Sequence, residues 1–351
     1  MSTENSEKIE FAAAIAPKGI EVPQVIDKKG SRRFILWGAD NRLPNFIWDQ
    51  YLLCSELQSV ANTVADYIIG EGVISDYSHM SDDDETLEEV VQRCVLDYVL
   101  FGGFAVECIR NQYGDIVRVN YQNVMNVRVD EELTTAYLAN EWGTWSQKNL
   151  VELPLYDKNQ VQPHFLMYYR GTITRNINPI PIWIGCLKSV VILNNTRNFH
   201  LNNLENGFSA NVIINLNNGN IKSREMAEIK EKLEMGYCGT DNSGKFILIN
   251  NPDKEHAVTI ERLQSDQFGD LYKSLQESST EDLYAAFRIN KMLVGVNVQT
   301  GFSKEEFEQA YELFNKTVVS PLQNNVIKAF RKIGVGIEFK PFQAFKNTES
   351  I

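Results

Sequence analysis

The segment that comes closest to a catalytic motif is the loop Gly239–Lys245, which reads GTDNSGK. In a phosphate-binding loop, backbone N–H groups and the lysine surround the phosphates, and the next residue is a serine or threonine that holds magnesium. Here the next residue is Phe246, and the pattern predicts a helix before the loop and a strand after it, the reverse of the required order. We interpret the segment as a helix-to-strand turn. A nucleotide-binding enzyme that uses this loop is kept as an alternative function.

Acidic and histidine side chains form no recognisable metal-binding pattern. The run Asp82–Glu85 lacks the alternating oxygen ligands and central glycine of a calcium loop. Acids at this place favour the N-terminus of the helix that is predicted next. The histidines have no second ligand at helical or turn spacing, so we expect no bound metal. They are His79, His164, His200 and His256.

Nucleophilic chemistry has no better support. Ser209 follows Gly207 at two-residue spacing, but Asn211 stands where a nucleophile elbow has its second glycine. The cysteines are odd in number and widely scattered, which favours reduced thiols in a cytosolic setting over disulfides or a zinc site. They are Cys54, Cys94, Cys108, Cys186 and Cys238. These patterns predict a protein that is not an enzyme and has no cofactor.

The composition predicts a soluble protein that does not grip nucleic acid. The 351 residues suffice for one or two hydrophobic cores. The formal net charge of -12 argues against tight phosphate binding, which needs clustered lysine and arginine. No apolar run approaches the roughly 20 residues of a membrane helix, and the run Phe11–Ala16 is too short for a signal peptide core.

Two predicted helices joined by a short loop dominate the last third of the chain. Ser303 and Glu306 form a capping box that starts the second helix, and Pro321 predicts a kink or break inside it. Its apolar stripe ends near Gly334. The first helix runs from Ser265 to about Leu293 with a thin apolar stripe and a polar middle, which is typical of a helix that packs on other long helices or lines a wet space.

The first half of the chain predicts an α+β domain. A short strand at 34–37 leads into a turn at Asp40-Asn41, and a helix that ends at Gly70 has Ser55 and Gln58 as its capping box. A second helix is capped by Thr86 and Glu89 and stops at Gly102-Gly103. Strands at 104–110, 116–121 and 124–129 predict an antiparallel meander, and Trp142, Trp145 and the run 165–169 suggest further strands.

The middle and the end of the chain contain three more predicted features. An asparagine-rich helix spans 185–206 and should need neighbours to stay folded, because asparagine is a modest helix former. Residues 210–262 read as a compact βαββ-like insert with strands at 212–216, 246–249 and 258–263 and a short helix capped by Ser223. A last strand is expected at 337–339.

The order of these elements resembles that of the portal proteins of tailed bacteriophages over most of the chain. The residues that carry the resemblance in the first half are Trp37–Asn41 with Pro44, Tyr67–Gly72, and Leu100–Val106 with Gly114 in the next turn. Those in the second half are Phe199 through Asn206–Phe208, Asn242–Lys245, Asp266–Phe268, and the loop after Leu293 that leads to Phe314 and Pro321.

The resemblance implies a portal fold with an α+β wing, long stem helices, a small α/β clip, and a tunnel loop followed by a kinked helix. Its segments would be a flexible N-terminal arm (1–30), the wing (31–184), a stem helix (185–209), the clip (210–262), a second stem helix (263–293), the tunnel loop (294–302), the kinked helix (303–333), and a C-terminal strand and tail without a large crown (334–351).

The resemblance also implies a function in the virion. Portal proteins form rings, usually of twelve copies, at one capsid vertex, and double-stranded DNA is packaged and ejected through the ring. The clip would face the packaging motor, the terminase large subunit, and later a head-completion or adaptor protein. The wing would face the major capsid protein and scaffold. The chain would be made in the host bacterial cytoplasm, with no membrane partner. A different head–tail connector protein is a further alternative.

The predicted tunnel loop carries no acid and no base, so it is expected to touch DNA without forming a charged trap. Its residues are Val294, Gly295, Val296, Asn297, Val298, Gln299, Thr300, Gly301 and Phe302. An acidic chain would give a repulsive wall to DNA, which carries one charge per ~1.7 Å. Arg288, Lys291 and Lys304 are candidates for weak phosphate contact. Solvation at the helix ends and pairing with Glu305 or Glu306 within the ring is at least as good an interpretation.

Overall fold

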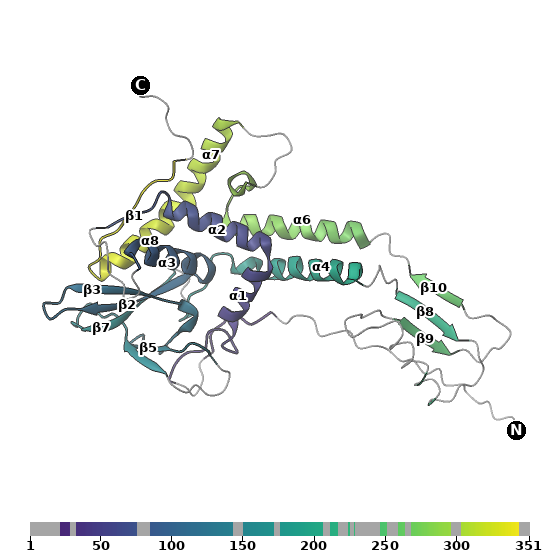
Figure 1. The fold of residues 1–351 in the computed structure, drawn as a ribbon, viewed down its shortest axis with the longest axis horizontal. Coiled ribbons are helices and arrows are strands. Elements are labelled where there is room, and N and C mark those ends of the chain that lie inside the picture. The colour runs from purple at the N-terminus through teal and green to yellow at the C-terminus, as the bar shows by residue number, and fades with distance from the viewer. Residues whose placement is uncertain are drawn as a thin grey trace. The chain divides into compact units, whose positions relative to one another are not determined.

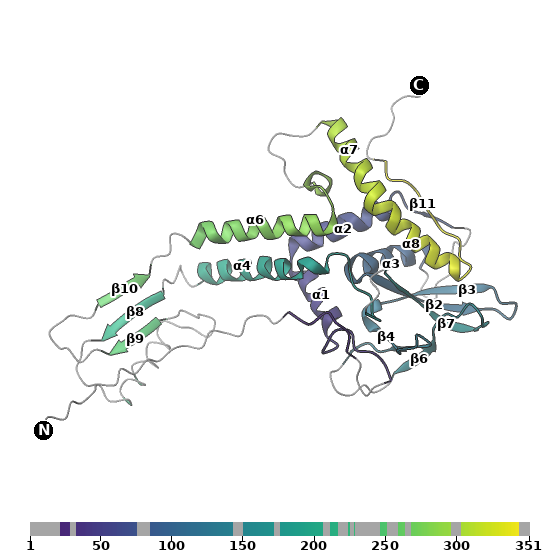
Figure 2. The same ribbon diagram turned by 180° about the vertical axis from the view of Figure 1, so that it is seen from behind.

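The computed structural model describes residues 22–28, 33–75, 85–142, 150–171, 176–205, 211–216, 224, 228, 246–250, 259–263, 268–295 and 303–343. They form two compact units (Figures 1 and 2). The larger unit comes from Val22–Val191 and Ser278–Ile351, and the smaller from Ile192–Glu277. The helices are α1 (Leu43–Leu53), α2 (Ser55–Ile69), α3 (Leu87–Phe101), α4 (Leu187–Glu205), α6 (Phe268–Phe287), α7 (Lys304–Phe314) and α8 (Ser320–Lys332).

The larger unit is built on two antiparallel sheets that share a core. One sheet has the order β3-β2-β7, with β2 (Gly103–Arg110) between β3 (Ile116–Gln122) and β7 (His164–Arg170). Alternate residues of β2 point to opposite faces. Phe104 on one face stacks on Phe330 of α8 with ring centroids 5.9 Å apart. Ala105 on the other face packs with residues of the second sheet. Figure 1 shows α3 and α8 on one side of the first sheet and β5 on the other.

The predicted meander of three strands is wrong, because its third segment belongs to the second sheet. The segment 124–129 does not continue as a third strand, because Asn123 caps a 3-10 turn at Val124–Asn126 by accepting a bond from Met125 N at 2.9 Å. The chain then enters β4 (Val127–Val129), which pairs with β5 (Thr135–Leu138), and β5 pairs with β6 (Val151–Pro154). Trp142 lies outside any strand, and Trp145 falls outside the described residues. Sequence reasoning therefore missed the partners of β4.

The start of the larger unit also differs from expectation. Residues 34–37 make one isolated bridge, between Lys28 and Leu36, in place of the predicted strand. The turn at Asp40-Asn41 is confirmed, since Asp40 accepts from Arg42 N at 3.1 Å and Asn41 has φ 66°. The unpredicted helix α1 follows directly. The capping box at Ser55 and Gln58 is wrong: α1 runs into α2 through Cys54, whose carbonyl accepts the bond from Gln58 N.

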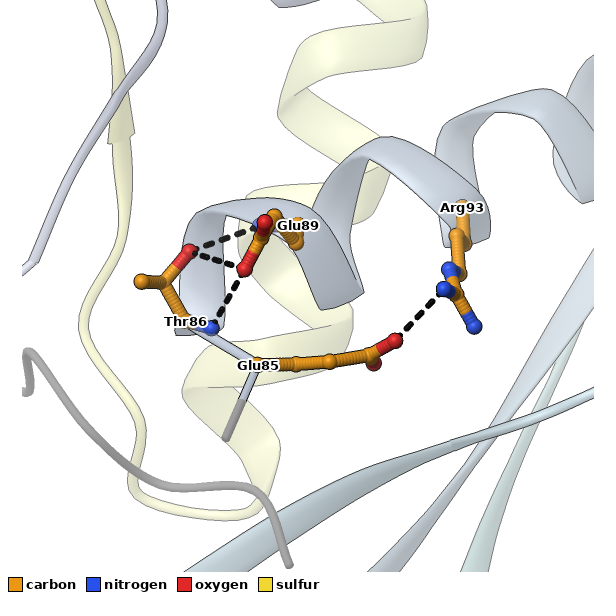
Figure 3. Close-up of polar contacts among 4 residues, drawn as sticks. All are labelled: Glu85, Thr86, Glu89 and Arg93. Carbon is orange, nitrogen blue, oxygen red and sulfur yellow. Dashed lines mark hydrogen bonds and ion pairs between the residues drawn. The ribbon is translucent and has the colours of Figure 1, made fainter. Parts of the chain in front are cut away.

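The predicted N-terminus of α3 is confirmed in detail (Figure 3). Thr86 Oγ1 accepts from Glu89 N at 3.3 Å, and Glu89 Oε2 accepts from Thr86 N at 2.7 Å, which completes the capping box. Glu85, just before the helix, forms an ion pair with Arg93 of α3, at 2.5 Å. Residues 82–84, from the predicted acidic run, fall outside the described residues. At the other end, Gly102 terminates α3 with φ 81°.

The helix predicted to kink or break near Pro321 is irregular there but not broken. Residues 304–332 are helical without interruption, with a π-helical turn at Asn315–Val319 between α7 and α8. Pro321 follows in the first turn of α8, directly after this turn. α8 ends at Lys332, just before Gly334 with φ 89°. The last predicted strand is also present, as β11 (Glu338–Phe339), which pairs antiparallel with β1 (Val73–Ile74).

The smaller unit contains the predicted insert as far as it is described. Its sheet has the order β10-β8-β9, in which β8 (Asn211–Leu216) is parallel to β9 (Phe246–Asn250) and antiparallel to β10 (Thr259–Leu263). Arg224 and Glu228 are helical, in agreement with the short predicted helix, whose proposed cap Ser223 falls outside the described residues. In the same unit, Phe199 of α4 packs on Tyr272 of α6 with centroids 4.6 Å apart.

A buried carboxyl in the larger unit predicts a measurable pH dependence. Asp97 of α3 accepts bonds from Tyr121 Oη at 3.0 Å and Val124 N at 3.2 Å, and burial raises its pKa to about 7 despite these bonds. Because the folded-state pKa lies above the unfolded value of 3.8, this group contributes stability at low pH that is lost as the pH rises through about 7.

Replacing this carboxyl by an amide should remove the pH dependence. When the pH is raised from 5 to 8, the unfolding free energy of wild type should fall by about 2 kcal/mol more than that of Asp97→Asn. The size follows because each pKa unit is worth about 1.4 kcal/mol. Urea unfolding of both proteins at the two pH values measures the difference. An equal difference at both values would contradict the assignment.

Candidate functional site

The predicted tunnel loop is preceded by a helix that is shorter than expected. α6 ends at Phe287, six residues before the predicted end at Leu293. Arg288 adopts φ 54°, and the bonds from Ile289 N to Tyr284 O and from Arg288 N to Ala285 O close the helix in a Schellman motif. A non-glycine residue in this conformation gives little sequence signal, which is why the end was misplaced.

A short 3-10 helix then carries the chain to the loop. It spans Lys291–Val294 and is capped by Asn290, whose Oδ1 accepts from Met292 N at 3.0 Å. Gly295 ends it with φ 75°. Val294 is partly buried and Gly295 is exposed. Val296 to Phe302 fall outside the described residues, so the role predicted for them remains a prediction.

The chain returns at the N-terminus of α7 through the predicted capping box. Ser303 Oγ accepts from Glu306 N at 3.1 Å, and Glu306 Oε2 accepts from Ser303 N at 3.0 Å. The box satisfies two backbone donors that would otherwise face solvent without a partner inside the helix. The first turn of α7 is therefore defined by local sequence alone.

The candidate phosphate contacts beside the loop are mostly engaged with glutamates. Lys291 Nζ lies 3.1 Å from Glu281 and 5.8 Å from the centre of the Tyr284 ring. Lys304 Nζ lies 3.6 Å from Glu308, one helical turn along α7. Both lysines thus pair with glutamates of the same chain, and the pairing with Glu305 or Glu306 within the ring stays a prediction. Such exposed pairs are worth about 0–1 kcal/mol, so both lysines can still exchange partners. Arg288 is exposed.

A buried tyrosine that sequence reasoning did not single out for the loop lies against both of its flanks. Tyr67 of α2 donates its hydroxyl to Leu293 O at 3.1 Å. Its ring lies 5.6 Å from the Tyr311 ring and 5.7 Å from the Phe314 ring, both on α7. The apolar stripe of the second helix predicted that Tyr311 and Phe314 pack inward. Nothing in the sequence indicated which side chain they would meet.

No enzyme-like centre is assembled by the residues that the structure describes. Among them, no group of three or more histidine, cysteine or acidic side chains is placed to hold a metal. His164 is not isolated as expected, because its Nε2 meets Glu107 Oε1 at 2.5 Å across the strands β7 and β2. Cys94 is buried, and burial raises the pKa of its thiol well above the usual value, which disfavours the reactive thiolate. His79, His256, Ser209 and Cys238 fall outside the described residues.

The loop Gly239–Lys245, the candidate for nucleotide binding, falls outside the described residues. The element after it is described. β9 begins at Phe246, immediately after Lys245, and pairs in parallel with β8. A phosphate-binding loop needs a helix N-terminus at this place, and a strand offers no converging set of N–H groups to an anion.

No helix in the described part of the chain is long and apolar enough to cross a membrane.

Comparison by sequence finds no relatives: no family model and no curated protein matches the chain. Comparison by structure does. A chain in the virion of a native gene transfer agent particle has a TM-score of 0.57 at 13% identity, over 91% of this chain and 88% of that one. A chain in the neck of the native particle, computed with C12 symmetry, has a TM-score of 0.56 at 11% identity, over 91% and 87%.

A third similar structure is a portal protein by its own description. It is an HK97 family phage portal protein from Corynebacterium diphtheriae, with a TM-score of 0.56 at 9% identity, over 84% of this chain and 94% of that chain. At such identities the likeness speaks for the fold. The predicted mixed α+β architecture and its resemblance to the portal fold are thereby confirmed.

Proposed function

We propose that this chain, which has the portal fold, is a portal subunit. Its copies would assemble into a ring at one capsid vertex, through which double-stranded DNA passes during packaging and ejection. The observation that carries the proposal is the structural likeness to a phage portal protein, which extends over 84% of this chain and 94% of the other. The particle structures that contain similar chains support a place in a virion.

The charge distribution supports a conduit over a DNA-gripping protein. A net charge of -12 opposes persistent phosphate binding, and two of the three basic side chains that flank the loop already pair with Glu281 and Glu308. Counterion release gains little from a lysine that must first leave a glutamate. DNA is therefore expected to pass the loop with weak, exchangeable contacts.

The assembly and its partners follow from the same proposal. The ring would hold twelve copies, in line with the C12 symmetry with which a structure containing a similar chain was computed. The smaller unit would meet the terminase large subunit and later a head-completion or adaptor protein, and the larger unit would meet the major capsid protein and scaffold. The segment boundaries set by the resemblance, including the wing at 31–184 and the clip at 210–262, belong to this proposal.

The mass of the assembly in solution tests the proposal most directly. The purified chain is expected to form a ring of about twelve times the 40.1 kDa subunit, with a central hole in electron micrographs. Native mass spectrometry measures the copy number. A protein that stays monomeric at micromolar concentration, and binds a nucleotide that Lys245→Ala abolishes, would replace this proposal by the nucleotide-dependent enzyme. A ring whose subunits lack the long helices α4 and α6 at their interfaces would favour a different connector protein.

A further inference from the structure

The two described flanks of the loop meet the same side chain, Tyr67. This residue lies near the C-terminus of α2 and is 7% exposed. Its hydroxyl donates to the carbonyl of Leu293, itself 4% exposed, in a buried bond of 3.1 Å that joins positions 226 residues apart. Leu293 is the second-last residue of the 3-10 helix before the loop. Tyr67 therefore holds the turn that leads into the loop.

The ring of Tyr67 is packed against the segment that follows the loop. The rings of Tyr311 and Phe314 on α7 have their centroids within 5.7 Å of it, in tilted and edge-to-face contacts. Edge-to-face and tilted pairs at this distance add about 0.5–1.5 kcal/mol to the area that they bury. The same side chain thus holds the returning helix by its ring and the departing turn by its hydroxyl.

The C-terminal tail closes the remaining side of this cluster. Phe342 lies 4.9 Å from the Tyr67 ring, and its carbonyl accepts from Tyr311 Oη at 3.4 Å. The tail is held in place by its backbone, because Lys340 N donates to Gly72 O at 2.9 Å and Lys340 O accepts from Glu71 N at 3.2 Å. The position of Phe342 is therefore set by the end of α2, the element that carries Tyr67.

The hydroxyl of Tyr67 has a role that packing does not explain. A phenylalanine would fill the same space, yet only a tyrosine can satisfy the buried carbonyl of Leu293. Burial, reinforced by nearby Tyr311, raises the pKa of Tyr67 to about 12, so the hydroxyl remains a donor at neutral pH. Within the turn, Leu293 N bonds to Asn290 O and Gly295 N bonds to Met292 O. The carbonyl of Leu293 is the group through which the turn is attached to α2.

We propose that Tyr67 is a positioning residue for the DNA-facing loop: in one socket with Tyr311, Phe314 and Phe342, it sets both the departure at Leu293 and the return along α7. The inference rests on the function proposed for the loop at 294–302. Its consequence is a mechanical one. A displacement of α7 or of the C-terminal tail would reach the departing turn through Tyr67, which contacts all three segments, so both flanks would move together.

Hydrogen–deuterium exchange on the full-length assembly tests the proposal. In Tyr67→Phe, the amides of Leu293 and Gly295 are expected to exchange about two- to tenfold faster, because the turn has lost its attachment while the ring packing is kept. Tyr98→Phe is the matched control. Tyr98 is also 7% exposed, and its hydroxyl accepts from Asn325 Nδ2 at 3.0 Å, so this variant loses a comparable bond between α3 and α8. In Tyr98→Phe, the exchange rates of the Leu293 and Gly295 amides should equal those of wild type.

Equal exchange at Leu293 and Gly295 in wild type and Tyr67→Phe would overturn the proposal. A second variant tests the socket: Phe342→Ala keeps Tyr67 and should also accelerate exchange at these two amides, and unchanged rates would remove the tail from the socket. The exchange rates do not depend on DNA. If acidic substitutions in the loop leave packaging intact, the proposed function of the loop fails while a local change in exchange still stands.

Discussion

Particles assembled with an Asn297→Asp, Gln299→Glu variant are expected to contain at least about tenfold less DNA than wild-type particles, with rings of normal mass. The two changes keep the shape of the side chains and add two negative charges per subunit to a loop without acids. Each charge would meet DNA phosphates in every copy of a ring. Unit charges about 4 Å apart repel by about 1–4 kcal/mol near a protein surface, and about 1.4 kcal/mol is a factor of ten. Quantifying DNA in gradient-purified particles measures the effect.

The appropriate control places a negative charge elsewhere on the larger unit. Gln58 is exposed on α2, and Gln58→Glu is expected to leave packaging unchanged. The two results together separate a local effect at the loop from a general effect of net charge. Normal DNA content in the loop variant, at normal ring mass, would remove the loop from the DNA path.

Gly102→Ala is expected to destabilise the larger unit by on the order of 3–5 kcal/mol. Gly102 ends α3 with φ 81°, a conformation that costs an alanine about 1–2 kcal/mol. An added Cβ would also lie 2.1 Å from Ile180 O and 2.3 Å from Ile180 C, and neither backbone atom can move without displacing the segment that leads into α4. Thermal or urea unfolding measures the loss.

A second glycine isolates the steric part of this effect. Gly114 in the β2–β3 turn has φ 91°, and nothing lies within 4 Å of the position where a Cβ would be. Gly114→Ala should therefore show the conformational cost alone, about 1–2 kcal/mol. Similar losses in both variants would mean that the segment at Ile180 yields easily, and that the close contact at Gly102 does not hold α3 against the start of α4.

Distant segments of the larger unit are connected at three places. The close approach at Gly102 fixes the segment before α4, while the Tyr67 socket fixes the two flanks of the loop. Trp183 adds a third connection: its Nε1 donates to Val99 O at 3.1 Å, and its ring stacks on Phe287 at the end of α6 with centroids 6.1 Å apart. Trp183, four residues before α4, therefore connects the end of α6 to α3.

Several parts of the fold were predictable because their cause is local. The capping boxes at Thr86 and Ser303 need only a hydroxyl and a glutamate three residues apart. The π-helical turn before Pro321 lies where the missing N–H and the ring of a proline predict an irregular helix. The strands β2, β3, β7, β8, β9 and β10 were recognised by runs of apolar residues between turn residues. In these cases the neighbours along the chain supply nearly all of the interactions that decide the conformation.

The errors arose where the deciding partner is distant or the signal is unusual. Ser55 had the sequence of a cap, but α1 already supplies a carbonyl at Cys54. β4 does not continue the predicted meander, because the 3-10 turn capped by Asn123 redirects the chain. It pairs with β5, which pairs with β6, and neither of these short strands has a strong pattern of its own. Arg288 ended α6 early in a conformation for which glycine or asparagine would have been the expected signal.

The sequence by itself determined the class of the fold, the order of its elements and the position of an uncharged loop between two helices, because these depend on periodicity, caps and charge. Only the tertiary structure decided what holds the flanks of that loop. Tyr67, Leu293, Tyr311 and Phe342 are spread over four segments, and the hydrogen bond and ring contacts that join them exist only once α2, α7 and the tail are packed. A contact between positions 226 residues apart leaves no periodic trace in either segment.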